Sequence, residues 1–304
     1  MRCSQKNRKP RRCSTLKDLL FWVPGFQEIS SLNVKLWKNL PANVSAILIS
    51  MAIFVPIYLI LVNSLKDEIQ SRAMGVGLPT SIHWENYLTV IEQGRLGVAF
   101  VNSMIYATGA TIVVVILSTT AAFVLSRNRS PRNRFLYIFI TLGLAMPINY
   151  VTLTKIMQAT HLVNTVVGIV LLYAATKIPF AVFLTYAFVE TIPKELDEAA
   201  ILDGCSPLTL FFKIIFPLLT PAWVTTAILS FLDFWSEFVL PLYFLQSSTK
   251  WPMTLAVYNF FGMFEARWNL VSADIVLTIL PVIAVYLLGQ RYIVSGMTAG
   301  AVKG

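Results

Sequence analysis

Long apolar stretches constrain this chain more than any other feature of its sequence. Crossing a hydrocarbon core of about 30 Å takes roughly 20 helical residues. Six stretches meet that requirement: 44–63, 98–125, 135–157, 165–189, 222–245 and 273–290. Hydrophobic residues make up 56% of the chain and charged residues 13%, which is more apolar surface than a soluble domain can bury. The sequence therefore predicts an all-α integral membrane protein with about six transmembrane helices, the third and fourth forming a tight hairpin around His161.

The basic residues are distributed unevenly around these stretches. Seventeen Lys and Arg lie in segments on the side of the two termini, and five lie on the opposite side. Because basic residues collect on the cytoplasmic side of membrane proteins, we expect both termini and the segment 190–221 to be cytoplasmic. A basic N-terminus is also typical of nucleic-acid binding. A topology signal in contact with lipid headgroups explains the charges more simply, so we expect membrane lipid and no nucleic acid as a partner.

Three parts of the chain follow from this topology. They are a basic cytosolic N-terminal segment (1–43), a transmembrane domain (44–291) and a short cytosolic tail (292–304). A short amphipathic helix is expected near 28–38, lying against the membrane surface. The three cysteines all fall on the cytoplasmic side, so no disulfide is expected. The two histidines are far apart and have no cysteine neighbours, so nothing predicts a metal site.

The cytoplasmic segment 190–221 has the sequence signals of a helical hairpin. Thr191 can cap a helix that starts at Pro193, a residue suited to a first helical turn because it has no N–H. Gly204 is placed to end this helix with a positive φ. A second short helix is expected over 207–213, ending before Pro217.

One face of the first hairpin helix combines small and acidic residues. Leu196, Ala199, Ala200 and Asp203 follow helical spacing, with Glu198 beside them. Two alanines on one face would let the helix sink into a groove on another protein, while Glu198 makes a polar contact. The alternative is an ordinary amphipathic loop resting on lipid headgroups.

The order and spacing of these residues resemble a known family motif. Glu198-Ala199-Ala200, followed at fixed distances by Gly204, Ile214 and Pro217, is similar to the EAA loop of permease subunits of ABC importers. Two positions depart from the family pattern. Phe216 stands where Leu is usual and Cys205 where Ala is common, and both replacements are apolar or small.

The resemblance covers about residues 80–304. The segments FEARWNL and QRYIVSGMTAGAVKG near the end of the chain, and Asn102-Ser103, are similar to the carbohydrate-importer permeases of the maltose type. This resemblance implies a permease of the type I ABC importer fold in the cell membrane, carrying a sugar or oligosaccharide. The alternative cargo is another solute such as a glycerol phosphate or a polyol.

The resemblance also implies a set of partners. These are a second permease subunit, two ATP-binding ABC subunits, and an extracellular or periplasmic solute-binding protein. The chain has no GxxxxGK[ST] loop, so ATP is expected to bind only the partner subunit, and the chain itself is expected to be no enzyme and to hold no cofactor. The residues that the resemblance assigns to ATPase coupling are Glu198, Ala199, Ala200, Asp203, Gly204, Ile214 and Pro217.

Charged residues inside the apolar stretches mark a second candidate site. Asp233 and Glu237 are four residues apart in the fifth stretch and are expected to share a helical face. Because an intramembrane charge is costly, both should face other helices or water. They either line a translocation pathway or contact the second permease subunit. The residues assigned to this site are Asn149, Tyr150, Asp233, Trp235 and Glu237.

Two other classes of protein remain as alternatives. A self-sufficient proton-coupled transporter would use carboxylates such as Asp233 as a proton relay without any ATPase. An integral-membrane enzyme would need a polar catalytic cluster at the membrane interface, and the sequence holds no convincing one.

Overall fold

The computed structural model describes residues 40–261 and 266–301, and the chain forms two compact units, 1–58 and 59–304. In the first unit, residues 40–58 form the first part of helix α3 (Leu40–Ser64), where the ring centroids of Phe54 and Tyr58 are 6.4 Å apart. The amphipathic helix expected near 28–38, the rest of the basic segment before residue 40 and the last three residues of the tail lie outside the described residues.

The second unit is built from helices, in agreement with the predicted all-α class. Within the described residues there is no strand, only an isolated bridge between Phe261 and Ala266. After α3 the α-helices are α4 (Glu68–Ser71), α5 (Glu85–Gln93), α6 (Leu96–Arg127), α7 (Pro131–Leu142), α8 (Tyr150–Ala159), α9 (Val166–Val189), α10 (Glu195–Leu202), α11 (Pro207–Leu210), α12 (Phe216–Leu218), α13 (Thr220–Ser236), α14 (Val239–Phe244), α15 (Met253–Ala256) and α16 (Trp268–Ala301). Shorter turns are the π-helix η1 (Phe211–Ile215) and the 3-10 helices η2 (Ser248–Lys250) and η3 (Val257–Phe260).

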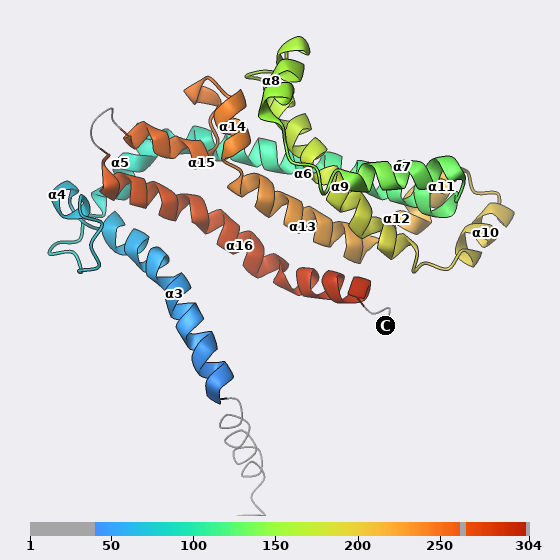
Figure 1. Ribbon diagram of the computed structural model, residues 1–304, viewed down its shortest axis with the longest axis horizontal. Coiled ribbons are helices and arrows are strands. Elements are labelled where there is room, and N and C mark those ends of the chain that lie inside the picture. Colours follow the sequence, from blue (N-terminus) through green and yellow to red (C-terminus); the bar gives the residue numbers. More distant parts are fainter. Residues whose placement is uncertain (1–39, 262–265, 302–304) are drawn as a thin grey trace, which may run out of the picture. The chain divides into compact units, whose positions relative to one another are not determined.

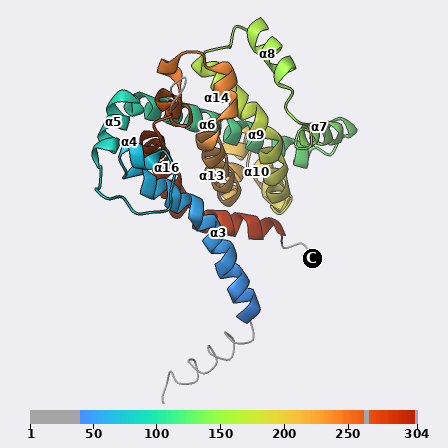
Figure 2. The same ribbon diagram turned by 60° about the vertical axis from the view of Figure 1, so that its left-hand side comes forward.

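Four long helices form the centre of the second unit. Helix α6 packs against α9 and α13, and α13 packs against α16, so these helices run side by side in the ribbon views (Figure 1 and Figure 2). Small side chains let helix backbones approach closely, which is how many membrane helices associate. The small buried residues of α6 recur at roughly one-turn intervals and include Ala99, Ser103, Ala107, Ala110, Ser118 and Ala122.

Four of the six predicted spans are confirmed as single helices long and apolar enough to cross a membrane. They are Asn43–Ser64, Leu96–Arg127, Val166–Val189 and Trp268–Gln290. A fifth span is formed if Pro207–Leu218 and Thr220–Ser236, which meet at an angle of 75°, are taken as one bent crossing. Within the described residues the count of six is therefore not confirmed.

The third predicted span, 135–157, is broken. Helix α7 ends at Leu142 and α8 begins at Tyr150, with no helix between them. Gly143 and Pro147 lie in the gap, and proline removes a backbone donor and disfavours helix in the residue before it. Helix α7 packs along α9. Helix α8 reaches α9 through residues 160–165, a turn in which His161 adopts a φ of 57°.

A buried network of amide side chains holds together the end of the unit where α5 lies. Asn86 of α5 donates from Nδ2 to the carbonyl oxygens of Ser64 and Lys66, at 2.9 and 2.8 Å. Its Oδ1 accepts a hydrogen bond of 2.9 Å from Nδ2 of Asn269 in α16. All four residues are buried. One side chain therefore ties α5 to the end of α3 and to the start of α16.

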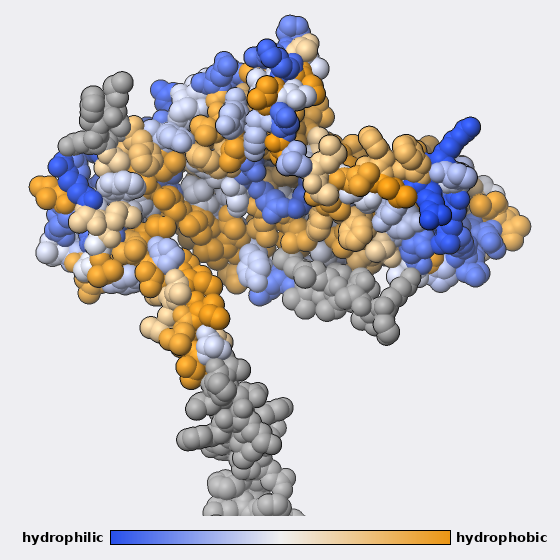
Figure 3. All heavy atoms as spheres, viewed as in Figure 1, coloured by the Kyte–Doolittle hydropathy of each residue, from blue (hydrophilic) through white to orange (hydrophobic). Residues whose placement is uncertain are grey.

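The surface of the second unit separates by polarity. Figure 3 shows mostly hydrophobic residues over the middle of the body, and hydrophilic residues gathered at the end that holds α10, at the opposite end near α4, and at the tip of α8. A hydrophobic zone between two polar ends is the pattern expected of a protein that spans a bilayer.

Candidate functional site

The segment after α9 forms the predicted helical hairpin, with a later start than expected. Helix α10 begins at Glu195, and its N-cap Lys194 makes no side-chain capping bond. Thr191 does not cap it, because the Thr191 hydroxyl donates to the carbonyl of Phe188 at 2.7 Å, within the preceding turn. The expected start at Pro193 is therefore wrong by two residues. The acidic residues of the first turn still lie where a helix dipole favours negative charge.

Gly204 makes the turn between the two arms, as predicted. Its φ is +80°, a left-handed conformation that costs glycine nothing. The Gly204 N–H donates to the carbonyl of Ile201 and the Cys205 N–H to that of Ala200, each at 3.0 Å, which satisfies carbonyls at the end of α10. A Cβ built on Gly204 meets nothing within 4 Å, so only the backbone conformation demands glycine here.

The second arm is longer than predicted. Ser206 caps α11, since its Oγ accepts from the Thr209 N–H at 3.3 Å. The helix continues through η1 and α12 to Leu218, and so passes Pro217 instead of ending before it. In η1 the N–H of Phe216 donates five residues back to the carbonyl of Phe211. Such wide turns relieve local clashes and missing donors, which explains how the arm accommodates Pro217.

The two alanines of the motif face different ways. Ala200 is only 4% exposed and packs into a cluster with Phe188, Phe211 and Leu219 of its own chain. Ala199 is exposed. The single outward face predicted for α10 is therefore wrong, because Ala200 is used to seat the helix on the body of the protein.

Two arginines, one at the end of α6 and one two residues beyond it, anchor the segment 190–221 that forms the hairpin. Nε of Arg127 lies 2.6 Å from Oδ2 of Asp197, and Nη2 of Arg127 donates to the carbonyl of Ile192 at 3.1 Å. Arg129 pairs with Glu190 at 2.7 Å. Sequence analysis missed both pairs. The available signal was that Arg127 and Arg129 follow the apolar stretch 98–125, while the acidic residues Glu190 and Asp197 follow the stretch 165–189.

The outward surface of the hairpin, called here the hairpin tip, combines exposed apolar and acidic side chains. Leu202 is 87% exposed, which is unusual for a leucine in a folded structure. The other exposed residues of the tip are Leu196, Ile201, Leu208 and Phe212, with the carboxylates Glu195, Glu198 and Asp203. Of the remaining motif residues, Ile214 is half-buried against the hairpin cluster and Pro217 is exposed. An exposed apolar patch with a charged rim fits contact with another protein.

The two carboxylates of the second predicted site, Asp233 and Glu237, lie at a polar cavity between α9 and α13. Asp233 forms an ion pair with Lys177 of α9, whose Nζ also lies 4.7 Å from the centre of the Phe180 ring. The Lys177 side chain is 19% exposed and that of Asp233 60%. The cavity, of about 380 Å³, is lined by Tyr173, Thr176, Lys177, Asp233, Phe234, Ser236, Glu237 and Leu240.

Asp233 and Glu237 reach this cavity in different ways. Helix α13 ends at Ser236 and Glu237 is extended, with ψ at 126°, so the two residues do not share a helical face as expected. Oε1 of Glu237 accepts from the backbone N–H groups of Val239 and Leu240, at 2.8 and 3.0 Å, and caps α14. Both residues nonetheless line the one cavity.

A second cavity, of about 700 Å³, lies at the break between α7 and α8. Asn149 lines it and caps α8, its Oδ1 accepting from the Thr152 N–H at 3.1 Å. Thr176 and Lys177 line this cavity and the polar cavity alike. Asn149 and Asp233, far apart in sequence, are thus brought to adjoining spaces.

The two remaining predicted residues do not line either cavity. Tyr150 stacks on Tyr243, with ring centroids 4.9 Å apart. Trp235 is buried, donates from Nε1 to the carbonyl of Thr278 at 3.1 Å, and packs against Phe100. These contacts are those of packing side chains.

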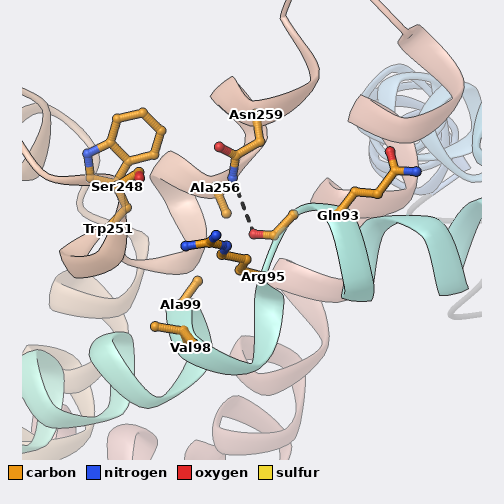
Figure 4. A pocket seen from close by; sticks show the side chains of 9 residues that line it. Gln93, Arg95, Val98, Ala99, Ser248, Trp251, Ala256 and Asn259 are labelled. Atoms are coloured by element: carbon orange, nitrogen blue, oxygen red, sulfur yellow. Dashed lines mark hydrogen bonds between the residues drawn. The ribbon is translucent and has the colours of Figure 1, made fainter.

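A smaller cavity, of about 260 Å³, lies between the start of α6 and the segment around η2 and α15 (Figure 4). Arg95, which precedes α6 with a φ of 51°, extends into it beside Trp251. Asn259 closes one side by donating to the carbonyl of Gly94 at 3.2 Å. This space lies near α5, away from the hairpin.

Comparison with known proteins identifies the family. The family model described as "Binding-protein-dependent transport system inner membrane component" matches residues 114–299, which is more than half of the chain and includes the hairpin. The chain is 32% identical over 259 residues to the probable starch degradation products transport system permease protein AmyC of Thermoanaerobacterium thermosulfurigenes, covering 84% of this chain and 94% of that protein. It is also 32% identical over 262 residues to the melibiose/raffinose/stachyose import permease protein MelC of Bacillus subtilis, covering 85% and 95%.

The fold agrees with this assignment. The structure resembles a chain in the crystal structure of a bacterial ABC transporter involved in the import of the acidic polysaccharide alginate, with a TM-score of 0.72 and 22% sequence identity, covering 84% of this chain and 96% of that one. The chain belongs to the family of inner membrane permease components of binding-protein-dependent ABC importers.

Proposed function

We propose that this chain is a permease subunit of an ATP-driven importer of a sugar or oligosaccharide. The support for this cargo is that the relatives AmyC and MelC, and the diacetylchitobiose uptake permease NgcG of Streptomyces coelicolor, are all named for saccharides. A relative in Agrobacterium fabrum is named for sulfoquinovosyl glycerol. A glycerol-linked or polyol cargo is therefore the second candidate.

The observation that carries the coupling proposal is the hairpin tip. Its leucines are held out into solvent by a hairpin that is itself fixed to α6 through Arg127 and Asp197. A flexible loop lying on lipid would need no such anchor. An anchored hairpin with an apolar tip is suited to dock into a separate ATPase subunit. This chain has no phosphate-binding loop, so ATP would bind to that subunit.

Movement of the docked subunit would reach the membrane helices by two routes. One runs from Asp197 to Arg127 and so into α6. The other runs along α11, η1 and α12 to the 75° bend before α13. Both α6 and α13 belong to the central helix packing. Alternating access would then follow ATP binding and release. By linkage, docking of a loaded solute-binding protein and binding of ATP to the partner subunit would each favour the other.

The remaining partners in this proposal are a second permease subunit, two ATP-binding subunits and a solute-binding protein on the outer face. The charge asymmetry supports placing both termini and the hairpin in the cytoplasm. The polar cavity and the cavity that holds Asn149 would face the second permease and contribute to the pathway between the subunits. Carboxylate oxygens and the Lys177 ammonium are suitable partners for sugar hydroxyl groups.

The proton-coupled alternative receives less support. Asp233 is paired with Lys177, and Glu237 accepts two backbone hydrogen bonds. The oxygens of both carboxylates therefore already hold fixed polar partners within the chain. Such groups suit fixed contacts with a polar cargo better than they suit proton carriers.

Gentle solubilisation of native membranes and purification through a tag on this chain tests the proposal. We expect an ATPase subunit and a second permease to co-purify, and Leu202→Asp to lose the ATPase while keeping the second permease. The matched control is Leu88→Asp, since Leu88 is also exposed but lies on α5, away from the hairpin. Recovery of the unaltered chain alone, still transporting after reconstitution, would favour the proton-coupled carrier. Retention of the ATPase by Leu202→Asp would exclude docking through the hairpin tip.

A further inference from the structure

A cavity that the coupling proposal does not use lies where α6, α7 and α9 meet. It has a volume of about 580 Å³. Arg129 and Arg134 line it together with Asn133 and Glu190. Because Arg129 and Glu190 follow the ends of α6 and α9, the cavity lies at the polar end of the unit that carries the hairpin.

The cavity carries a surplus of positive charge. Arg129 is neutralised by Glu190, with Nη2 2.7 Å from Oε2. Arg134 is exposed, and no carboxylate in the described part of the chain forms an ion pair with it. A guanidinium presents several N–H donors in a fixed plane, which matches the oxygens of a phosphate. The lining therefore favours an anion with several acceptor oxygens.

The wall of the cavity is aromatic and its flank is apolar. Tyr137 and Tyr186 lie with ring centroids 4.1 Å apart and line the cavity. Ile138, also in the lining, continues into the exposed apolar face of α7, which carries Phe135 and Phe139. The surface over α7 is mostly hydrophobic in Figure 3. Tyrosines of this kind collect at the level of lipid headgroups, between the polar and the apolar zone of a bilayer.

We propose that this cavity binds the phosphate headgroup of an anionic membrane lipid. Arg134 contacts the phosphate, Tyr137 and Tyr186 border it, and the acyl chains extend along Phe135 and Phe139. Basic pockets between transmembrane helices on the cytoplasmic side are suited to acidic lipid headgroups. A free phosphate would use the arginine but would leave the adjoining apolar face of α7 unused. The proposal depends on membrane insertion and not on the docking of the hairpin.

Titration of the assembled, detergent-purified complex with lipid, followed by native mass spectrometry, tests this site. Phosphatidylglycerol and phosphatidylcholine of equal chain length serve as probes. We expect a preference for phosphatidylglycerol that falls about tenfold in Arg134→Gln, the loss expected for one charged hydrogen-bonded contact. Arg134→Lys should keep part of it, since a point charge still attracts phosphate. Arg132→Gln is the matched control, because Arg132 is exposed on the same turn of α7 but does not line the cavity.

Several outcomes would overturn the proposal. Equal binding of the two lipids, or equal losses in Arg134→Gln and Arg132→Gln, would show that the cavity does not select an anionic headgroup. Displacement of the lipid by glycerol 3-phosphate at equal concentration would assign the cavity to a soluble phosphate. Absence of bound lipid in the assembled complex, with lipid bound only when the second permease is removed, would show that α7 is a subunit contact. None of these results bears on co-purification of the ATPase, so the two proposals fail separately.

Discussion

Arg127 at the end of α6 holds Asp197 of α10 through a contact of 2.6 Å between Nε and Oδ2, and each side chain is 13% exposed. The hairpin is therefore fixed to a central helix by a largely buried ion pair. Removing one partner of such a pair leaves the other charge without compensation, which costs more than the pair itself contributes.

The first prediction concerns this anchor. Asp197→Asn should destabilise the seating of α10 by about 1–3 kcal/mol, since Arg127 would keep only its bond to the Ile192 carbonyl among those described. The expected result is faster hydrogen exchange of the backbone amides over 195–203, with the rest of the protein unchanged. Arg132→Gln is the control, as it removes a nearby exposed arginine. Unchanged exchange in Asp197→Asn would show that packing of Ala200 alone seats the helix.

A second prediction rests on the backbone of Gly204. With φ at +80° and open space around a built Cβ, a substitution is strained only through its backbone. Gly204→Val should abolish uptake while the protein remains in the membrane, because a β-branched residue avoids this conformation at a cost of about 1–2 kcal/mol or more.

Two companion variants make that test specific. Gly204→Asn should retain most of the uptake, since asparagine tolerates the left-handed region. Gly97→Val adds the same side chain at a glycine that has equally open surroundings and no left-handed φ. It should leave uptake nearly unchanged. Normal uptake by Gly204→Val, measured with labelled sugar in intact cells, would refute the role of the hairpin turn.

Sequence reasoning predicted best those features that depend on neighbouring residues. The turn at Gly204 and the long helices α6, α9 and α16 follow from local composition, and the structure has them. The break at Gly143–Asn149 also has a local cause, in Gly143 and Pro147. Mean hydropathy over 135–157 predicted a single span there, because it responds to apolar content and not to backbone donors.

The pairings across the chain could not be predicted in the same way. Arg127 and Asp197 are 70 positions apart, and Lys177 and Asp233 are 56 apart. Which charges form ion pairs depends on how α6, α9, α10 and α13 pack. Local patterns in a single sequence do not reveal that packing. The inward rotation of Ala200 has the same origin, because helical spacing defines faces but does not say which face meets the protein body.

The third prediction separates charge balance from transport at the polar cavity. Asp233→Asn leaves Lys177, only 19% exposed, without its acidic partner inside the membrane. We expect less protein in the membrane, because an unpaired intramembrane charge is costly. The double variant Lys177→Gln with Asp233→Asn should restore the protein level and still transport poorly.

A double-mutant cycle separates the effect of the ion pair on protein level from its effect on transport. Protein level is measured by blotting, and uptake is normalised to it. Full uptake by the double variant would assign the pair to folding alone. A protein level in Asp233→Asn equal to that of the unaltered chain would instead mean that another partner compensates Lys177 in the assembled complex.

The last prediction concerns the amide network at the end of the unit where α5 lies. The side chain of Asn86 makes three hydrogen bonds, to the carbonyls of Ser64 and Lys66 and with the amide of Asn269, in a buried environment. Asn86→Leu keeps the volume but leaves these polar groups without that partner, at a cost of about 2 kcal/mol or more. The Tm of the detergent-solubilised protein, followed by tryptophan fluorescence, should fall by about 5 °C or more. Asn259→Leu removes one 3.2 Å bond at an exposed position and should shift Tm much less. Equal shifts in the two variants would mean that water or a rearranged Lys66 replaces the lost bonds, and that the network does not hold α5 to α16.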